Sequence, residues 1–175
     1  MVNVLSININ GIRKGYKRSW IKAILVEFKI QVLCIQETKR EQLKDREVKS
    51  IEGRKLSCWA HSAAIGTSGG IGTLWNPEFL LIHYTQENRN FLLVSGIVKT
   101  SKDPISIVNV YAPQDDGNKQ SLWDHIADCI NQDSNRNWLV CRDFNEVRSQ
   151  EERIGSLFLA SGARRFNDFI DRARL

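Results

Sequence analysis

The sequence lacks the features that mark several common protein classes. No apolar run approaches the roughly 20 residues that a membrane-spanning helix needs, and the N-terminus shows no basic stretch followed by an apolar one. We therefore expect neither a transmembrane segment nor a secretory signal peptide. Proline is scarce, and there are no repeats, low-complexity segments or Pro/Gly-rich linkers. The 175 residues, of which 42% are hydrophobic, predict a single globular domain over residues 1–175.

Cysteine patterns typical of disulfide frameworks or zinc sites are also missing. The four cysteines, Cys34, Cys58, Cys129 and Cys141, form no C-x-x-C pair. We expect free thiols in a reducing compartment, where they behave as small hydrophobic side chains. Cys58 and His61 have a spacing seen in zinc sites, but no second pair of ligands accompanies them, so zinc is not expected.

The positive charge of the chain is concentrated near its N-terminus. The net charge is +5, and residues 1–29 hold six basic residues against one acidic residue, Glu27. The rest of the chain holds nineteen of each sign. A basic segment of this kind favours a polyanionic partner such as nucleic acid. A solvated, lysine-rich start of a helix would give the same pattern, and the sequence leaves both interpretations open.

Apolar periodicity predicts helices that alternate with strands. Helices are expected over residues 17–28, over 119–132 and from Ala160 onward, the first with an apolar stripe made of Trp20, Ile21, Ile24, Leu25 and Phe28. The charged stretch 39–55 predicts a loop and a short solvated helix. Strand-like runs occupy residues 2–7, 31–36, 57–63, 71–75, 79–85, 91–99, 104–110 and 138–141. This order predicts a layered α/β fold with a mixed sheet rather than a doubly wound parallel sheet.

Four of the predicted strands end on polar residues that can handle metal or phosphate. The endings are Asn8 with Asn10, Gln36-Glu37-Thr38-Lys39, Asn109-Val110-Tyr111-Ala112-Pro113, and Asp143-Phe144-Asn145. In mixed α/β proteins the ends of neighbouring strands converge, and ligands collect there. The sequence therefore predicts one shared site built from carboxylate, amide and phenol groups.

Each of these endings has a chemical and a structural interpretation. Glu37 suits a hard cation such as Mg²⁺, although a salt bridge to a nearby lysine would also explain it. Tyr111 is equally compatible with a half-buried core position. Asp143 is suited to take a proton from water and Asn145 to hold the nucleophile, whereas an Asx-type turn is the alternative. Because the set contains no Cys or Ser nucleophile with a partner His, it favours metal-assisted hydrolysis of a phosphate ester.

The segment Ser68–Trp75 is rich in glycine at the start of a predicted strand. A phosphate-binding loop of the P-loop type would require Lys followed by Ser or Thr, and none follows here. We therefore expect a bulge or a tight turn at these glycines.

Five motifs, in this order, resemble those of the endonuclease/exonuclease/phosphatase family. They are L-S-I-N-I-N-G-I-R, I-Q-E-T-K, S-G-G-I-G-T-L-W, V-N-V-Y-A-P and D-F-N-E-V. The nearest resemblance is to the endonuclease domain at the N-terminus of plant LINE-type (non-LTR) retrotransposon polyproteins, and the stretch E-V-R-S-Q-E-E-R-I-G-S adds to it. The resemblance covers essentially the whole chain.

The resemblance implies a two-sheet mixed β sandwich flanked by helices. It also implies hydrolysis of a phosphodiester in DNA with Mg²⁺, or Mn²⁺ in its place, which nicks the target so that reverse transcription starts there. By motif, Asn8 and Glu37 would hold the metal. The catalytic residues would be Tyr111, Asp143 and Asn145, and the substrate-binding residues would be Asn10, Arg13, Lys14 and Lys39.

Two departures from the family pattern predict impaired activity. Arg142 stands where the family has glycine, which puts bulk and positive charge beside Asp143. The late Ser-Asp-His motif of the family has no counterpart, so we expect a C-terminally truncated domain that lacks its last strands. The Asp124-His125 pair falls on a predicted helix, where we expect solvated side chains rather than a substitute for that motif.

Three other interpretations stay open at this point. The chain could be a catalytically dead nucleic-acid-binding remnant, a phosphomonoesterase of the same family, or a remnant that never folds stably. The expected partner is DNA, with a reverse transcriptase domain as a former fusion partner and no membrane. Ancestry predicts an intracellular, nuclear protein, and the sequence does not indicate its oligomeric state.

Overall fold

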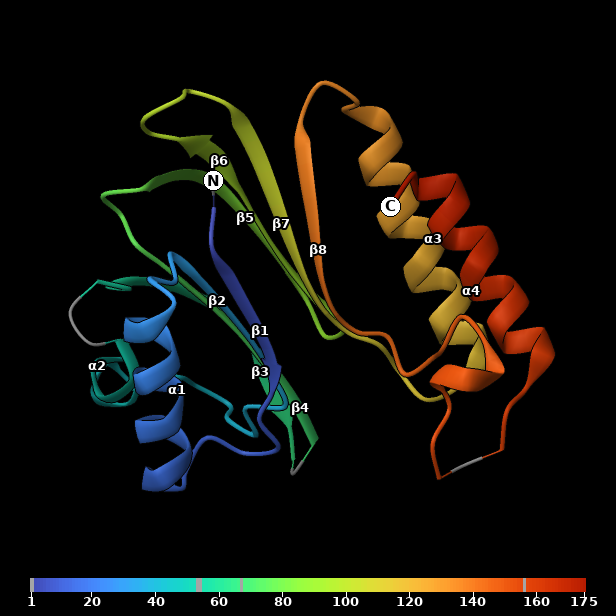
Figure 1. Ribbon diagram of the computed structural model, residues 1–175, viewed down its shortest axis with the longest axis horizontal. Helices are drawn as coiled ribbons and strands as arrows, with labels where there is room; N and C mark the ends of the chain where they lie inside the picture. Colours follow the sequence, from blue (N-terminus) through green and yellow to red (C-terminus); the bar gives the residue numbers. More distant parts are fainter. Residues whose placement is uncertain (1, 53–54, 67, 156) are drawn as a thin grey trace. The chain divides into compact units, whose positions relative to one another are not determined.

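The computed structural model describes residues 2–52, 55–66, 68–155 and 157–175. The chain divides into two compact units, one made of residues 1–111 with 136–143 and the other of residues 112–135 with 144–175 (Figure 1). The sequence predicts a single domain, which would require these two units to associate. That association stays a prediction. Within the described residues, no helix is long and apolar enough to cross a membrane.

The first unit contains a four-stranded sheet in the order β1-β2-β4-β3. Its strands are β1 (Val4–Asn8), β2 (Val32–Gln36), β3 (Cys58–Ile65) and β4 (Ser68–Trp75). β1 and β2 run parallel, whereas β2 with β4 and β3 with β4 are antiparallel. The sheet is therefore mixed, as the sequence predicts.

A second four-stranded sheet in the same unit has the order β5-β6-β7-β8. Its strands are β5 (Leu80–Asn88), β6 (Phe91–Val98), β7 (Pro104–Tyr111) and β8 (Asn137–Asp143). The pairs β5–β6 and β6–β7 are antiparallel, and β7 and β8 are parallel. Each sheet thus contributes one parallel pair, and the carboxyl ends of these two pairs carry the polar residues singled out above.

Apolar side chains from both sheets form one buried cluster, which includes Val32 and Cys34 of β2, Ile107 of β7 and Cys141 of β8. Burial of such side chains contributes roughly 1.5–3 kcal/mol each, which holds the sheets face to face. All four cysteines are free thiols, as expected. The pKa of Cys34 lies well above its ordinary range because its thiol is hydrogen-bonded to Cys141 and fully buried.

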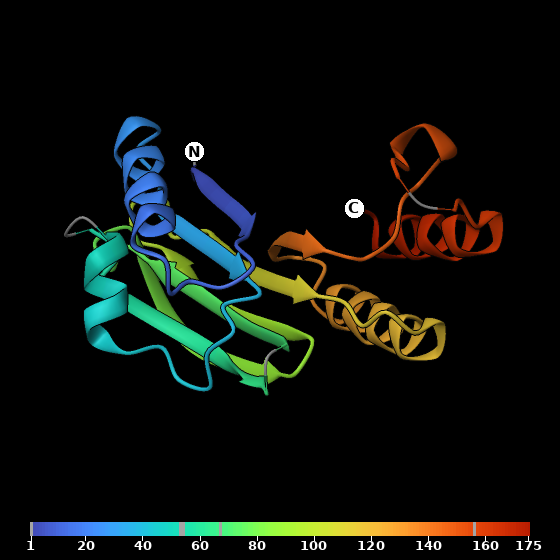
Figure 2. The same cartoon turned by 90° about the horizontal axis from the view of Figure 1, so that it is seen from below.

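Two helices cover the outer face of the first sheet (Figure 2). They are α1 (Gly15–Glu27) and α2 (Asp45–Glu52). Ile21 and Leu25 of α1, four residues apart and so on one face, pack into a second buried cluster with Val48 and Ile51 of α2. The basic N-terminal segment is thereby attached to the sheet that ends on Asn8 and Gln36.

Two details of the predicted helices were wrong. Trp20 and Phe28 are 55% and 57% exposed, so the apolar stripe of α1 is narrower than predicted, since only residues spaced like Ile21 and Leu25 reach the sheet. The helix in the charged stretch 39–55 is not solvated all round. Its residues Val48 and Ile51 are each 1% exposed, because they lie three residues apart on the face of α2 that packs into the core.

The second unit is built from α3 (Asp116–Gln132), a short 3-10 helix (Gln150–Glu152) and α4 (Ala160–Ala173). Its core is an aromatic cluster of Trp123, Phe144, Phe166 and Phe169, with ring centroids 5.0 Å apart for the Phe144–Phe166 pair and 5.3 Å for the Trp123–Phe166 pair. Aromatic pairs at such separations add to the free energy of burial. Phe144, which lies between Asp143 and Asn145 in the chain, is thus an anchoring residue of this unit.

Polar contacts also join the elements of the second unit. Lys119 of α3 is 3.0 Å from Glu146, and both side chains are buried. Asp124 forms an ion pair with Arg172 of α4. Asp124 nevertheless lies on α3 with a side chain that is 43% exposed, which agrees with the solvated helix position expected from the sequence.

Candidate active site at the ends of four strands

Two carboxylates from different sheets converge on one amide nitrogen. Nδ2 of Asn8 donates to Oε1 of Glu37 at 2.9 Å and to Oδ2 of Asp143 at 2.5 Å. The three residues lie at or directly after the ends of β1, β2 and β8. Residues separated by up to 135 positions in the sequence are therefore in direct contact, as the four polar endings predict.

Strand register explains why these residues meet. Asn8 is paired with Gln36 across the parallel β1–β2 pair, and Tyr111 is paired with Asp143 across the parallel β7–β8 pair. Parallel partners end at the same edge of a sheet, so each pair delivers two polar residues to one edge. The packing of the two sheets then brings both edges together.

The backbone bends sharply at the strand ends. Asn10, Glu37 and Lys39 have φ angles of 47°, 53° and 54°, in the left-handed region that side chains with a Cβ rarely adopt. Such residues cost of order 1 kcal/mol each and cluster at functional sites. The bend after Gln36 takes Glu37 out of the strand alternation, so its direction is set by the loop and not by β2.

A network of buried amide side chains supports the strand ends that carry Asn8, Glu37 and Asp143. Nε2 of Gln36 donates to Oδ1 of Asn109 at 2.5 Å and to Oγ of Ser6 at 3.1 Å. Nδ2 of Asn109 donates to the carbonyl oxygen of Gly72 at 2.9 Å. Gln36 and Asn109 are both fully buried. Because buried amides are stable only with partners, these bonds fix β2, β4 and β7 in one register beneath the site.

The glycine-rich segment holds the loop that carries Glu37. Thr38 N donates to Gly70 O at 2.9 Å, and Lys39 N donates to Gly69 O at 3.0 Å. Gly69 and Gly70 have φ angles of 75° and 82°. The predicted turn or bulge at these residues is therefore a local distortion of β4. It lets the backbone approach the Glu37 loop so closely that a side chain on Gly70 would collide with Thr38.

Tyr111 lies beside the two carboxylates. Burial raises the pKa of its hydroxyl, the negative charge of Glu37 and a hydrogen bond to that carboxylate raise it further, and a hydrogen bond with Ser68 acts in the opposite direction. Asp143 adds a smaller upward effect. The phenol therefore keeps its proton at neutral pH and can serve as a hydrogen-bond donor there.

The four residues predicted to bind substrate line one cavity of about 650 Å³. They are Asn10, Arg13, Lys14 and Lys39. Nζ of Lys39 donates to Oδ1 of Asn10 at 2.5 Å and lies 3.8 Å from Oε2 of Glu37, so the cavity adjoins the carboxylates. Oε2 of Glu37 thus makes the contact with a lysine that the salt-bridge interpretation expects. The metal interpretation concerns the other carboxylate oxygen, Oε1, which faces Asn8.

For two predicted residues, the structure gives no relation to this group. Asn145 belongs to the second unit, where Nδ2 donates to the carbonyl oxygen of Ala112 at 2.5 Å and φ is 51°. Its catalytic role stays a prediction. The side chain of Arg142 lies outside the described residues, and its effect on Asp143 stays a prediction too.

The donor set at this edge fits a hard cation. Oxygen atoms of Glu37 and Asp143 face the same point, at Nδ2 of Asn8, and a divalent ion such as Mg²⁺ is commonly held by one or two carboxylates and several waters. Within the described residues, no group of three or more His, Cys, Asp or Glu side chains is placed to bind a metal. A cation here would therefore rely on the two carboxylates. The Asn8 amide would have to turn toward them its oxygen, which accepts a hydrogen bond from Asn10 N.

The supporting residues were missed by sequence reasoning. Gln36 and Asn109 were noted only as parts of polar strand endings, and Ser68 and Gly70 only as parts of a glycine-rich run. A signal was present, because an uncharged amide inside an otherwise apolar strand is costly to bury without a partner. Two such amides in separate strands predict that they bond to each other.

Comparisons with known proteins place this arrangement in a known fold. The structure matches the AP endonuclease LMAP from Leishmania major with a TM-score of 0.69 and 15% identity, over 98% of this chain and 66% of that one. It matches an AP endonuclease from Archaeoglobus fulgidus with a TM-score of 0.69 and 16% identity, over 98% and 70% of the two chains. The Xenopus laevis APE2 catalytic domain gives a TM-score of 0.67 and 17% identity, over 95% and 67%.

The fold is that of the endonuclease/exonuclease/phosphatase proteins. Two mixed four-stranded sheets with flanking helices confirm the fold class predicted from the sequence. The chain spans about two thirds of the length of these structures. Neither a protein-family model nor a curated protein matches the sequence.

Replacing Gly70 with alanine tests whether the glycine-rich segment positions the Glu37 loop. We expect Gly70→Ala to lower the free energy of unfolding by about 1–3 kcal/mol more than Gly66→Ala, because only the first collides with Thr38. Gly66 is a matched control, since its φ is also positive, at 60°, and a Cβ there meets nothing within 4 Å. Chemical denaturation of both variants measures the difference. Equal destabilisation would contradict the close approach.

The raised pKa of Tyr111 predicts a late alkaline titration. The difference in ultraviolet absorbance between the wild-type chain and Tyr111→Phe should report a phenol that ionises above the ordinary value of about 10. Because the folded chain holds this proton to higher pH than the unfolded chain, stability should fall as pH rises from the unfolded pKa through the folded one. Glu37→Gln should lower the titration midpoint. A midpoint at the ordinary value would contradict the placement of Tyr111 beside Glu37.

Proposed function

We propose that this chain is the Mg²⁺-dependent endonuclease unit of a retrotransposon-type protein, which cleaves a phosphodiester bond in DNA. The observation that carries the proposal is the convergence of Glu37 and Asp143 on Asn8, next to a protonated Tyr111 and a basic cavity. The five ordered sequence motifs support the retrotransposon origin. The AP endonucleases of the same fold support an activity on DNA.

Each residue of the group has a task in this reaction. Glu37 and Asn8 would hold Mg²⁺, or Mn²⁺, which when bound supplies positive charge beside the phosphate oxygens. Asp143 orients the attacking water and accepts its proton. Tyr111 donates a hydrogen bond to a phosphate oxygen, and its raised pKa keeps that proton in place to higher pH. Asn10, Lys39 and the cationic residues around the cavity bind the DNA strand.

The chain on its own is expected to be a slow enzyme. His61 and His83, the histidines of the first unit, lie in β3 and β5 and make no hydrogen bond to Glu37 or Asp143 within the described residues. In the part of the chain that the structure describes, no histidine of the first unit is therefore placed to protonate the leaving oxygen or stabilise its charge at this edge. Loss of one such group commonly costs a factor of about 10²–10³ in rate.

Metal binding can be tested separately from catalysis. We expect Mg²⁺ to raise the melting temperature of the wild-type chain, because a ligand that binds only the folded state stabilises it. In Glu37→Gln this increase should be lost or greatly reduced. Glu27→Gln, which neutralises an exposed carboxylate of α1, is the control and should respond like the wild type. An equal response in all three proteins would rule out a metal at Glu37.

Nicking of supercoiled plasmid tests the reaction itself. We expect slow nicking that requires Mg²⁺, stops in EDTA and falls at least about 10²-fold in Asp143→Asn, because the water loses its base. Asp103→Asn changes an exposed aspartate in the turn between β6 and β7 and should nick like the wild type. Nicking that survives Asp143→Asn would refute the assigned site. Absence of nicking in a folded chain that binds DNA would favour the catalytically dead nucleic-acid-binding alternative.

A further inference from the structure

A second cavity in the first unit is lined almost entirely by basic side chains. Its volume is about 480 Å³, and its walls come from the start of α1, the loop after β2 and the N-terminal half of α2. The basic residues are Arg13, Arg18, Arg40, Lys44 and Arg46. A single carboxylate, that of Glu47, accompanies them.

Most of this positive charge is not neutralised by the protein. Glu47 is buried and forms an ion pair with Arg40, and its other oxygen accepts a hydrogen bond from Lys44 N at 3.2 Å. Within the described residues, no carboxylate forms an ion pair with Arg13, Lys44 or Arg46. Like charges around one cavity repel one another, so the arrangement is stabilised by an anion of more than one negative charge or by several linked anions.

Two of the cationic groups around the cavity are held in place before any ligand binds. Nη1 of Arg18 donates to the carbonyl oxygens of Ile12 at 2.9 Å and Arg13 at 2.6 Å, which holds the guanidinium against the start of α1. Arg40 is held by Glu47. Cationic groups that are already ordered lose little conformational entropy on binding a ligand.

The first turn of α2 carries acidic and basic residues side by side. Arg46 occupies the first turn of α2, where the helix dipole favours acidic residues and disfavours basic ones. Lys44 directly precedes the same turn. Asp45 and Glu47 satisfy the helix dipole in this turn, so Lys44 and Arg46 are additional positive charges at the cavity.

This cavity continues toward the candidate active site. It shares Arg13, Arg40 and Lys44 with the larger cavity that is lined by Asn10 and Lys39. Lys39 in turn contacts Glu37. Cationic side chains thus line both cavities from Lys39, beside Glu37, to α2, with Glu41 and Glu47 as the acidic residues among them.

We propose that the cavity formed by Arg13, Arg18, Lys44 and Arg46 is a phosphate-binding site for the DNA backbone, next to the candidate active site. The phosphate chemistry follows from the cluster alone, and the assignment to DNA rests on the proposed function. Lys44, directly before α2, and Arg46, in its first turn, supply the affinity for phosphate. Both residues lie outside the five motifs of the family resemblance. The site lets the chain bind DNA on one side of the cleaved phosphate without reading base sequence.

The salt dependence of DNA binding tests the proposal without cleavage. Binding of a short fluorescent duplex is measured in EDTA over a series of salt concentrations for the wild-type chain and for Lys44→Gln/Arg46→Gln. Each phosphate contact contributes about 0.9 to the slope of log affinity against log salt. We expect the slope of the double variant to be smaller by about 2, with weaker binding at every salt concentration.

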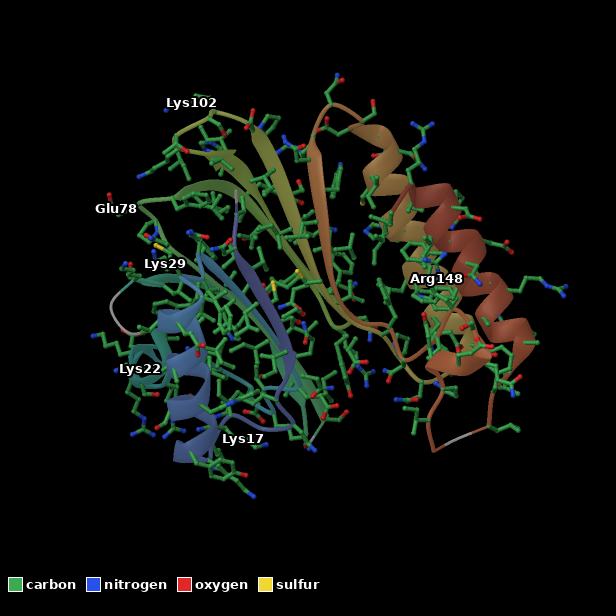
Figure 3. All side chains as sticks on the ribbon, in the orientation of Figure 1. Lys17, Lys22, Lys29, Glu78, Lys102 and Arg148 are labelled. Atoms are coloured by element: carbon green, nitrogen blue, oxygen red, sulfur yellow. The ribbon has the colours of Figure 1, made fainter. Side chains whose placement is uncertain are left out.

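A charge-matched control removes two lysines elsewhere in the same unit. Lys29→Gln/Lys102→Gln lowers the net charge by the same amount, and both residues lie away from Lys17 and the start of α1 (Figure 3). Its slope should stay within experimental error of the wild type. Equal changes in the two double variants, or no change in Lys44→Gln/Arg46→Gln, would overturn the proposal. Circular dichroism and melting curves confirm that both variants are folded.

Inorganic pyrophosphate distinguishes the two sources of phosphate. If pyrophosphate stabilises the wild-type chain through Lys44 and Arg46 while the DNA slope of the variant is unchanged, the cavity binds a small phosphate compound and the assignment to DNA is wrong. The pyrophosphate and DNA-binding measurements do not depend on nicking activity. A chain that binds DNA through this cavity but never nicks it would refute the proposed endonuclease activity and still support the phosphate site.

Discussion

The hydrogen bond between two buried amides, Gln36 and Asn109, is the constraint on which the site depends. Each lies in a strand of a different sheet, and each is fully removed from water. An amide in that position is destabilising by a few kcal/mol unless it is bonded, so the two sheets are stable together in the register that joins these side chains. That register sets the ends of β1, β2, β7 and β8 side by side, and the four ends carry Asn8, Glu37, Tyr111 and Asp143.

The same edge combines rigid strands with strained loops. Asn10, Glu37 and Lys39 all adopt positive φ angles, and the distorted glycines of β4 hold the Glu37 loop through backbone hydrogen bonds. If β2 continued as a regular strand, the side chain of Glu37 would point to the sheet face opposite to that of Gln36. The bend instead directs Glu37 toward Asn8 and Asp143. The conformational energy stored in this loop is offset by the burial of β2, all five of whose residues are inside the protein.

Electrostatics divide the edge into two parts with different roles. Glu37 and Asp143 bring negative charge together beside a phenol whose pKa is raised by burial and by these carboxylates. A few residues away, the cavities around Arg13, Arg40 and Lys44 carry excess positive charge. A cation on one side and a polyanion on the other would neutralise both. The proposed reaction and the proposed phosphate site therefore involve the same substrate. Cleavage and binding can still be measured separately.

Sequence alone determined the fold class, the four polar strand endings and most of the residues that meet there, because alternation of apolar side chains and the polar residue after each run are local patterns. It also indicated a basic segment, although Arg40, Lys44 and Arg46 could be added only once α2 was seen to pack beside α1. The exposure of Trp20 and the burial of Val48 were not predicted, since periodicity does not reveal which side chains of a helix reach the sheet. The direction of Glu37 and the bond between Gln36 and Asn109 were decided by tertiary structure, since both depend on contacts between strands far apart in the chain.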